Sequence, residues 1–466
     1  MATVPQSYTP HLLQTLQWIF DPLGYARGRF QSMGNVFEVK LPPATQDESF
    51  IFLNHPEAVQ FLLSHDNDEI FSSPGELNAL GESLLGKSSI LMQSGQEHRR
   101  RRKLMMPPFH GERMKAYGDL IGQITQEVMA TWVEGQIFIA RDEMQKITMR
   151  VILQAVFGLY SGERYQQLER LLAKRLNAVS SPLTSVFVFF PQLIVDLGPL
   201  SPGGQMRHIA EQIDDLLYAE IRDRRAHHDP SRSDVLSLLL SARDENGYGL
   251  TDEELHDELM TLLVAGHETT ATALAWAFYW IHYLPSVKTT LMAELDQHHG
   301  ANQLTISRLP YLNAVCNEAL RIYPVGLVTL LRRTEKACQV MGYDLQPGDL
   351  VTACIYLLHH REDVYPQADE FRPERFLERS FSPYEFLPFG GGSRRCIGAA
   401  LAMYEMTLVL QTILSQCELE LAESKPVQPI RRSGTLAPLG GVRLKKVGGR
   451  SPQADQSANP ELAYTS

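Results

Sequence analysis

The segment Phe389-Gly390-Gly391-Gly392-Ser393-Arg394-Arg395-Cys396-Ile397-Gly398 places one cysteine after a glycine-rich turn. Helical periodicity starts directly after it and predicts a helix over 399–417. The free N–H groups and the dipole of a helix N-terminus favour a thiolate over a thiol. The glycines carry no Cβ, so a flat, bulky ligand could lie close to the backbone. The segment therefore predicts a ligand site at the sulfur of Cys396.

An isolated thiolate restricts the kind of ligand. Zinc and iron–sulfur sites normally need four ligands with paired spacings, and no cysteine lies near Cys396 in the sequence. One anionic sulfur suits haem iron better. The other four cysteines are interpreted as small, buried apolar side chains: Cys316, Cys338, Cys354 and Cys417.

The ten residues around Cys396 resemble the haem-thiolate loop of the cytochrome P450 superfamily, through Phe389, Gly392, Arg394 and Gly398. The resemblance spans about residues 20–445. It implies a mainly α fold with a small β portion, in which haem b lies between a long central helix and the helix after Cys396. It also implies that Cys396 ligates the iron, and that Phe389, Arg394 and Gly398 contact the cofactor.

Composition restricts the class of protein. The 466 residues, 44% of them hydrophobic, suffice for a large core. The five cysteines show no regular pairing, which argues against a disulfide framework and for a reducing compartment. A net charge of −11 argues against a nucleic-acid role. The N-terminal residues include neither a basic n-region nor a long apolar stretch, so we expect no membrane anchor and a cytoplasmic location.

Hydrophobic periodicity predicts one large domain over 1–447, followed by a polar, disordered tail over 448–466. Strands are expected at 35–40, 50–53, 327–333, 338–341 and 349–357. Helices are expected at 56–65, 118–133, 141–158, 207–226, 232–243, 251–284 and 307–322.

The segment 251–284 is the longest predicted helix. Thr251 and Glu254 have the spacing of a capping box, and Pro285 ends the helix. The segment is apolar nearly all round, but His267 and Glu268 at its centre make a membrane span costly. A helix through the middle of a large core is the better interpretation.

This helix contains Ala265-Gly266-His267-Glu268-Thr269-Thr270. An acid beside two hydroxyls is costly in an apolar helix unless these groups are used, although threonines can bond back to helix carbonyls without any further role. The HExxH zinc motif is absent because residue 271 is Ala. The segment resembles the oxygen-activation motif of the same family. This implies that Thr269 holds a water or hydroperoxide, that Glu268 supplies protons and that Ala265 contacts the haem.

Two further sets of charged residues fit the resemblance. Glu318 and Arg321 share a helix face, and with Arg375 they resemble the family's buried Glu-Arg-Arg network, which implies a structural role. Haem carries two propionates, so cations should converge on it. The candidates are His98, Arg102, Arg332 and Arg394, although many relatives have Trp at the position of His98.

The run Arg99 to Lys103 is basic in an otherwise acidic protein. We expect Arg99, Arg100 and Lys103 to be exposed near Arg395, where they would dock an acidic electron donor by charge steering. The expected donor is a ferredoxin or flavodoxin with its reductase, because only about seventy residues follow Cys396.

The resemblance also places substrate-lining loops at 71–91, 183–200, 324–329 and 435–436. All four are apolar, which favours a lipophilic substrate, although core packing would explain each of them equally well. The overall pattern favours a long-chain fatty acid, with a terpenoid as the alternative.

The resulting hypothesis is a haem-thiolate monooxygenase that uses dioxygen to hydroxylate an unactivated C–H bond. A peroxide-driven or isomerising haem-thiolate enzyme is one alternative, but such enzymes tend to lose the pair Glu268 and Thr269. A non-catalytic haem sensor or carrier is the other, although no sensor or DNA-binding module accompanies the core.

Overall fold

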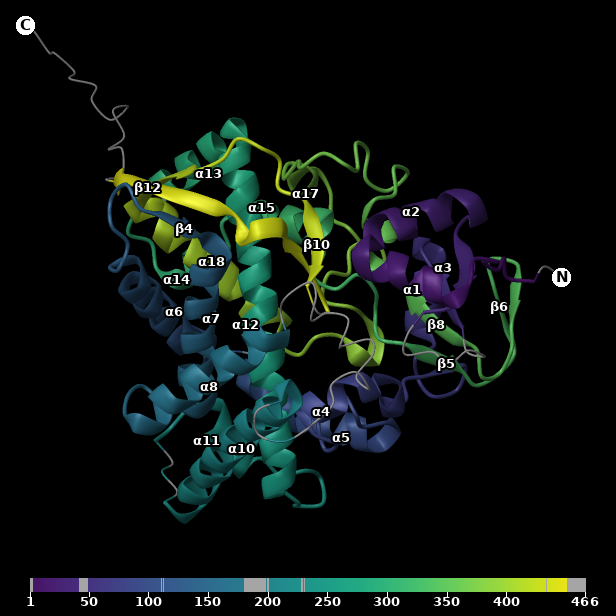
Figure 1. Ribbon diagram of the computed structural model, residues 1–466, viewed down its shortest axis with the longest axis horizontal. Helices are drawn as coiled ribbons and strands as arrows, with labels where there is room; N and C mark the ends of the chain where they lie inside the picture. The colour runs from purple at the N-terminus through teal and green to yellow at the C-terminus, as the bar shows by residue number, and fades with distance from the viewer. Residues whose placement is uncertain are drawn as a thin grey trace, which may run out of the picture.

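The computed structural model describes residues 3–41, 49–109, 111, 113–179, 198, 201–227, 229, 231–432 and 434–450. The helices are α1 (His11–Phe20), α2 (Pro22–Met33), α3 (Pro56–Ser64), α4 (Glu82–Leu85), α5 (Gly95–Met105), α6 (Arg113–Met129), α7 (Ala140–Phe157), α8 (Glu163–Val179), α10 (Pro202–Ala226), α11 (Val235–Ser241), α12 (Asp252–Tyr283), α13 (Pro285–Gln297), α14 (Gln303–Ile306), α15 (Pro310–Ile322), α16 (Ile355–His359), α17 (Arg375–Glu378) and α18 (Ala399–Gln416). Helix dominates (Figure 1), which confirms the mainly α prediction.

The strands are β1 (Val36–Val39), β2 (Phe50–Leu53), β3 (Phe71–Ser72), β4 (Ile137–Ile139), β5 (Arg332–Thr334), β6 (Cys338–Val340), β7 (Tyr343–Leu345), β8 (Leu350–Ala353), β9 (Cys417–Leu421), β10 (Pro429–Arg432), β11 (Thr435–Pro438) and β12 (Arg443–Gly449). The largest sheet has the order β1-β2-β8-β5-β3, with β2 and β8 parallel and the other pairs antiparallel. It therefore joins the N-terminal strands to the segment that follows α15.

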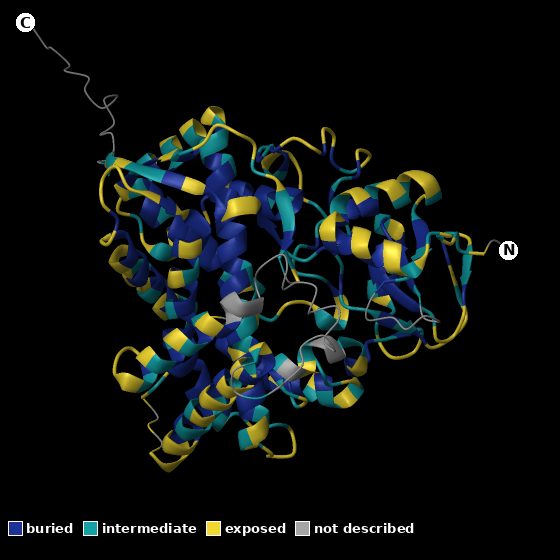
Figure 2. Cartoon of the chain, viewed as in Figure 1, coloured by how far each residue is buried: buried dark blue, intermediate teal, exposed yellow. Residues whose placement is uncertain are grey.

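Helix α12 is the centre of the fold. Thr251 Oγ1 accepts the Glu254 N–H at 3.2 Å, and the Glu254 carboxylate accepts the Thr251 N–H at 2.8 Å, which confirms the predicted capping box. The helix packs against α7, α10, α15 and α18. Figure 2 shows it dark blue along much of its length, as expected for a helix that is apolar nearly all round.

Several predicted elements differ from the structure near their ends. The predicted helix 307–322 begins at Pro310, since proline is favoured in the first turn. The predicted strand 349–357 ends at Ala353, and α16 follows it. Only the last part of 327–333 is a strand, β5, while Val328 forms an isolated bridge with Cys354.

The predicted tail starts too early. Strand β12 continues to Gly449, with Gly448 opposite Glu418 and Gly449 opposite Cys417 on β9. A break in register between Lys446 and Gly448 lets the glycines complete this pairing. In the part of the chain that the structure describes, no helix is long and apolar enough to cross a membrane.

Candidate active site

The loop that presents Cys396 depends on its glycines. Gly390 and Gly392 have φ values of +64° and +65°, which other residues rarely adopt. A Cβ on Gly391 would lie 2.5 Å from Leu63 Cδ1, and one on Gly392 would overlap the Asp66 carboxylate. The Cys396 N–H donates to the Phe389 carbonyl at 3.0 Å and closes the loop. A Cβ on Gly398, two residues after Cys396, would meet nothing within 4 Å, and neither would one on Gly390, so both glycines border open space.

The Cys396 thiol is exposed, yet burial among protein atoms raises its pKa. A thiol that borders an internal space is both accessible to solvent and surrounded by protein atoms, which accounts for the two observations. The Gly398 N–H and the positive charges of Arg102 and Arg395 oppose the rise in this pKa, because they favour the thiolate. The Gly398 N–H at the start of α18 therefore stabilises the thiolate, as predicted. Without a bound ligand, however, burial has the larger effect, and the pKa of Cys396 is raised.

The central motif of α12 is divided between two faces. Ala265 is exposed, Thr269 is half-buried, and the Thr269 hydroxyl donates to the Ala265 carbonyl at 2.5 Å. Glu268 is buried and faces α7, where Arg141 Nη2 lies 2.9 Å from its carboxylate. The structure therefore separates Glu268 from Thr269, two residues that the sequence interpretation joined in one proton path.

Gly266, the glycine of this motif, is explained by helix packing. A Cβ on Gly266 would lie 2.7 Å from Ile152 Cδ1, so the glycine lets α7 approach α12 closely. His267 is also buried, and burial lowers its pKa to about 4, so the ring is neutral.

Arg141 was missed by the sequence analysis, because nothing in the sequence of α7 distinguishes a buried arginine from a surface one. Its side chain is 1% exposed and is held by Glu268 and by the Gln145 side chain at 3.3 Å. The charge of Arg432 on β10 also acts on the same carboxylate. A buried carboxylate needs such partners, because an unpaired charge in the core is very costly.

Replacing Arg141 with methionine is expected to lower the free energy of unfolding by about 3 kcal/mol, because it leaves the Glu268 carboxylate buried without its main partner. The double variant Arg141→Met/Glu268→Gln should recover most of this loss. Urea unfolding of the haem-loaded protein measures both values. Arg150→Met on the same helix is the control, since its pair with Glu169 is a third exposed and should contribute at most about 1 kcal/mol. Equal losses in the single and double variants would contradict the pairing.

The four predicted cations have different surroundings. Burial and the nearby charges of Arg394 and Arg102 lower the pKa of His98 to about 4, so it is a neutral donor. Arg394 donates to the carbonyls of Ile90, at 2.9 Å, and Gln93, at 2.5 Å, and ties the cysteine loop to the segment before α5. Its pKa falls to about 10 through burial and the charge of Arg332.

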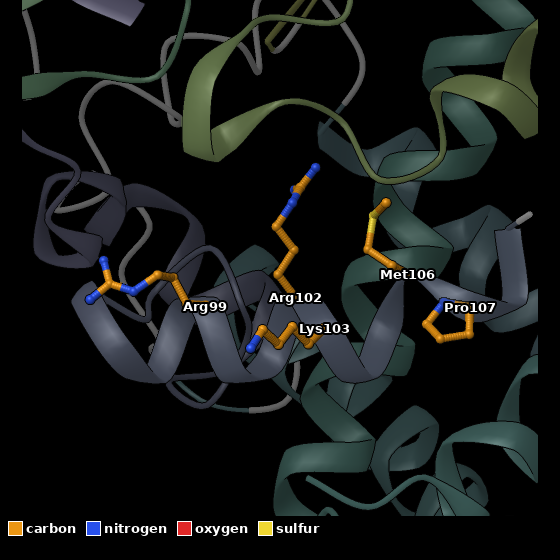
Figure 3. Close-up of a pocket in the computed structure, with 5 residues that line it drawn as sticks. All are labelled: Arg99, Arg102, Lys103, Met106 and Pro107. Carbon is orange, nitrogen blue, oxygen red and sulfur yellow. The ribbon is translucent and has the colours of Figure 1, made fainter. Parts of the chain in front are cut away.

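Arg102 and Arg332 offer free donor groups. No ion pair of Arg102 is found among the described residues, and its side chain stands up from α5 beside a hollow of about 550 Å³ that is also lined by Arg99, Lys103, Met106 and Pro107 (Figure 3). Arg332 pairs with Asp66 at 2.9 Å, but its Nε is buried and has no hydrogen-bond partner within the described ranges.

The predicted exposure of Arg100 is wrong. Its side chain is 24% exposed and pairs with Asp244 at 2.6 Å and Glu97 at 2.9 Å. Arg101 is more buried still and pairs with Glu258 at 2.9 Å, which fastens α5 to α12. Pairs with acidic residues far along the chain therefore hold Arg100 and Arg101, two of the five basic residues of this run, away from the surface. Arg99, Lys103 and Arg395 remain exposed.

The structure brings the predicted Glu-Arg-Arg residues together. Arg321 Nε lies 2.7 Å from Glu318, and Arg375 Nε lies 3.1 Å from it, with all three side chains at most 3% exposed. Arg321 also donates to the carbonyls of His359 and Ala368, each at 2.8 Å. The network thus joins α15 to the segment that leads to the cysteine loop.

Comparison with known proteins agrees with this arrangement. The profile of the family "Cytochrome P450" matches residues 12–445. The chain belongs to the cytochrome P450 family. A Mycobacterium tuberculosis (strain H37Rv) relative named "Putative cytochrome P450 135B1" is 35% identical over 89% of this chain and 85% of its own length. Another from the same strain, "Putative cytochrome P450 135A1", is 31% identical over 95% of both chains.

Solved cytochromes P450 share the fold. A cyanobacterial one, CYP120A1 with retinoic acid bound, superposes with a TM-score of 0.82 over 96% of this chain and all of its own, at 24% identity. The haem domain of cytochrome P450DA gives 0.81 over 97% of this chain and 99% of its own, at 23% identity. The family match and the curated relatives show that the chain is a haem-thiolate monooxygenase, and this family implies dioxygen and a redox partner.

The residues present fit the haem of this family. Cys396 provides the thiolate ligand, and Gly398 leaves the space beside it open. Among the described residues, the Arg332 Nε has no hydrogen-bond partner and Arg102 has no ion pair, so these two side chains would be the donors to the propionates. When bound, haem supplies dioxygen activation and oxygen transfer.

Proposed function

We propose that this cytochrome P450 hydroxylates a long-chain fatty acid, with a terpenoid as the alternative, using electrons from a ferredoxin or flavodoxin and its reductase. The observation that supports a lipophilic substrate is the convergence of three apolar segments. Leu77, Leu327 and Leu436 belong to one apolar cluster, and the Leu436 N–H donates to the Val325 carbonyl at 3.0 Å. The fourth predicted segment, 183–200, lies outside the described residues except for Gly198.

The proposed roles of the site residues follow from their surroundings. Arg102, Arg332 and neutral His98 hold the propionates, while Arg394 holds the cysteine loop, and Phe389, Gly398 and Ala265 border the haem. Thr269 already donates to Ala265, so its oxygen is oriented to accept a hydrogen bond from water or a protonated ligand. Glu268 must leave Arg141 before it can pass a proton to this side of α12. Glu318, Arg321 and Arg375 are structural.

The substrate proposal is tested by titrating the haem-loaded protein with fatty acids, their methyl esters and terpenoids. We expect long-chain fatty acids to displace the water ligand and shift the haem absorption band at micromolar concentration. Turnover should then require NADPH, ferredoxin and ferredoxin reductase. If only terpenoids shift the band, a terpenoid replaces the fatty acid as the proposed substrate. Turnover with peroxide alone would favour a peroxide-driven enzyme. No shift with any lipid would contradict a lipophilic substrate.

The donor surface is proposed at Arg99, Lys103 and Arg395. Arg99 pairs with Asp68 at 2.6 Å and Lys103 with Glu245 at 2.7 Å, all on the surface. Such exposed pairs contribute little stability, so carboxylates of an acidic donor can replace their partners. Because the chain as a whole has a charge of −11, this local positive patch must direct the encounter.

The double variant Arg99→Glu/Lys103→Glu is expected to slow the first electron transfer from a plant-type ferredoxin about tenfold at low salt. The difference from wild type should vanish at high salt, because salt screens exposed charges. Stopped-flow formation of the reduced carbon-monoxide complex measures the rate. Lys425→Glu, an exposed lysine outside the patch, is the control. If the double variant showed the wild-type rate and salt dependence, Arg99 and Lys103 would not be part of the donor-binding surface. Repeating the measurement with a flavodoxin shows which class of donor the enzyme prefers.

A further inference from the structure

Asp66 lies in the turn after α3, and its carboxylate connects three separate segments. Ser393, in the cysteine loop, donates to Asp66 Oδ2 through its backbone N–H at 2.8 Å and through its hydroxyl at 2.9 Å. Arg332, on β5, pairs with the same oxygen at 2.9 Å. Ser73, directly after β3, donates to Oδ1 at 2.8 Å.

This carboxylate is buried and ionised. The side chains of Asp66 and Arg332 are 2% and 1% exposed. Burial alone would raise the pKa of Asp66, but the charge and hydrogen bond of Arg332, together with those from Ser73 and Ser393, lower it. An ionised group of this kind is tolerated only where its hydrogen bonds are satisfied. The core therefore holds a permanent negative charge at Asp66.

The contacts of Asp66 fix the backbone conformation of the cysteine loop. Gly392 has φ +65°, and any Cβ there would overlap the Asp66 carboxylate, so loop and carboxylate are packed together. Arg332 also donates to the Gly391 carbonyl at 3.1 Å. Asp66 thus holds both neighbours of Gly392. It binds Ser393, three residues before Cys396, directly, and it holds Gly391 through Arg332.

We infer that Asp66 is a positioning residue for the Cys396 thiolate, and that its buried negative charge helps to set the reduction potential of the iron. Two hydrogen bonds from Ser393 hold the loop on the carboxylate, and the negative charge offsets that of Arg332. The inference relies on thiolate ligation by Cys396 and is independent of the substrate and donor proposed above. Nothing in the sequence around Asp66 indicates this role, since the segment 64–69 is a polar turn.

The test compares Asp66→Asn, Asp66→Ala and the control Asp68→Asn. Asparagine keeps an acceptor for Ser393 but removes the charge, so Asp66→Asn should favour ferrous over ferric iron about tenfold, a rise of about 59 mV for one electron. Asp68 is partly exposed and pairs with Arg99 on the surface, so the same substitution there should leave the potential unchanged. Potentials are measured by spectroelectrochemical titration without substrate or donor.

Asp66→Ala removes the acceptor as well as the charge. We expect it to lose the thiolate-type reduced carbon-monoxide spectrum at a lower urea concentration than Asp66→Asn, while circular dichroism still shows a folded chain. Should Asp66→Ala fail to fold, the potential of Asp66→Asn decides alone. A potential for Asp66→Asn equal to that of Asp68→Asn would overturn the inference.

Discussion

Cys396→Ser is expected to abolish the thiolate-type spectrum of the reduced carbon-monoxide complex and to reduce hydroxylation below detection. Cys396 is the thiol that borders the open space at Gly398, and the Gly398 N–H, Arg102 and Arg395 all favour its anion. A serine hydroxyl is not ionised at neutral pH, so the electron density that a thiolate gives to the iron is lost. Absorption spectra of reduced protein under carbon monoxide measure the change directly.

The matched control is Cys338→Ser. Cys338 is a half-buried free cysteine on β6, in a two-stranded sheet with β7, and the substitution is chemically identical. We expect its spectrum and turnover to equal those of the wild type. A thiolate-type spectrum in Cys396→Ser, with circular dichroism unchanged, would mean that another sulfur ligates the iron and that the assignment of this site is wrong.

Arg321→Ala is expected to cost about 3–5 kcal/mol of folding free energy and to prevent stable haem incorporation. The substitution leaves Glu318, 0% exposed, without its closest partner. It also removes the donor to the carbonyls of His359, Ala368 and Glu370. Buried acceptors that lose their hydrogen bonds add a further penalty. Urea unfolding, followed by circular dichroism and haem absorbance, measures the loss.

Two variants separate charge from geometry in this network. Arg321→Lys keeps the charge but not the planar fork that bonds the carboxylate at two points, so it should remain clearly destabilised. Arg379→Ala removes an arginine whose pair with Glu385 is about half exposed on the arginine side, and it should cost at most about 1 kcal/mol. If Arg321→Ala were no worse than Arg379→Ala, the network would not be a support of the fold.

Local sequence was sufficient where short-range chemistry decides the structure. The capping box at Thr251 and Glu254 marked the start of α12, since a cap depends on residues only three apart. The glycines before Cys396 indicated a tight loop, and Gly390 and Gly392 adopt the positive φ values that such a loop needs. The long apolar run indicated a buried central helix.

Short or irregular elements were harder to predict from sequence. Strand β12 extends through Gly448 and Gly449, two residues typical of flexible tails, because β9 offers the backbone partners. The segment after Ala353 turns into α16 although its apolar composition also suits a strand. In both places tertiary pairing overrides weak local preferences.

The family, the ligand cysteine and the central helix follow from the sequence alone, because each depends on residue types at fixed short spacings. The partners of the charged residues were decided only by the tertiary structure. Asp66 meets Arg332, Arg141 meets Glu268, and Arg100 meets Asp244, in each case across more than a hundred residues of chain. The physical reason is that an ion pair depends on distance in space and on burial, and a linear sequence specifies neither.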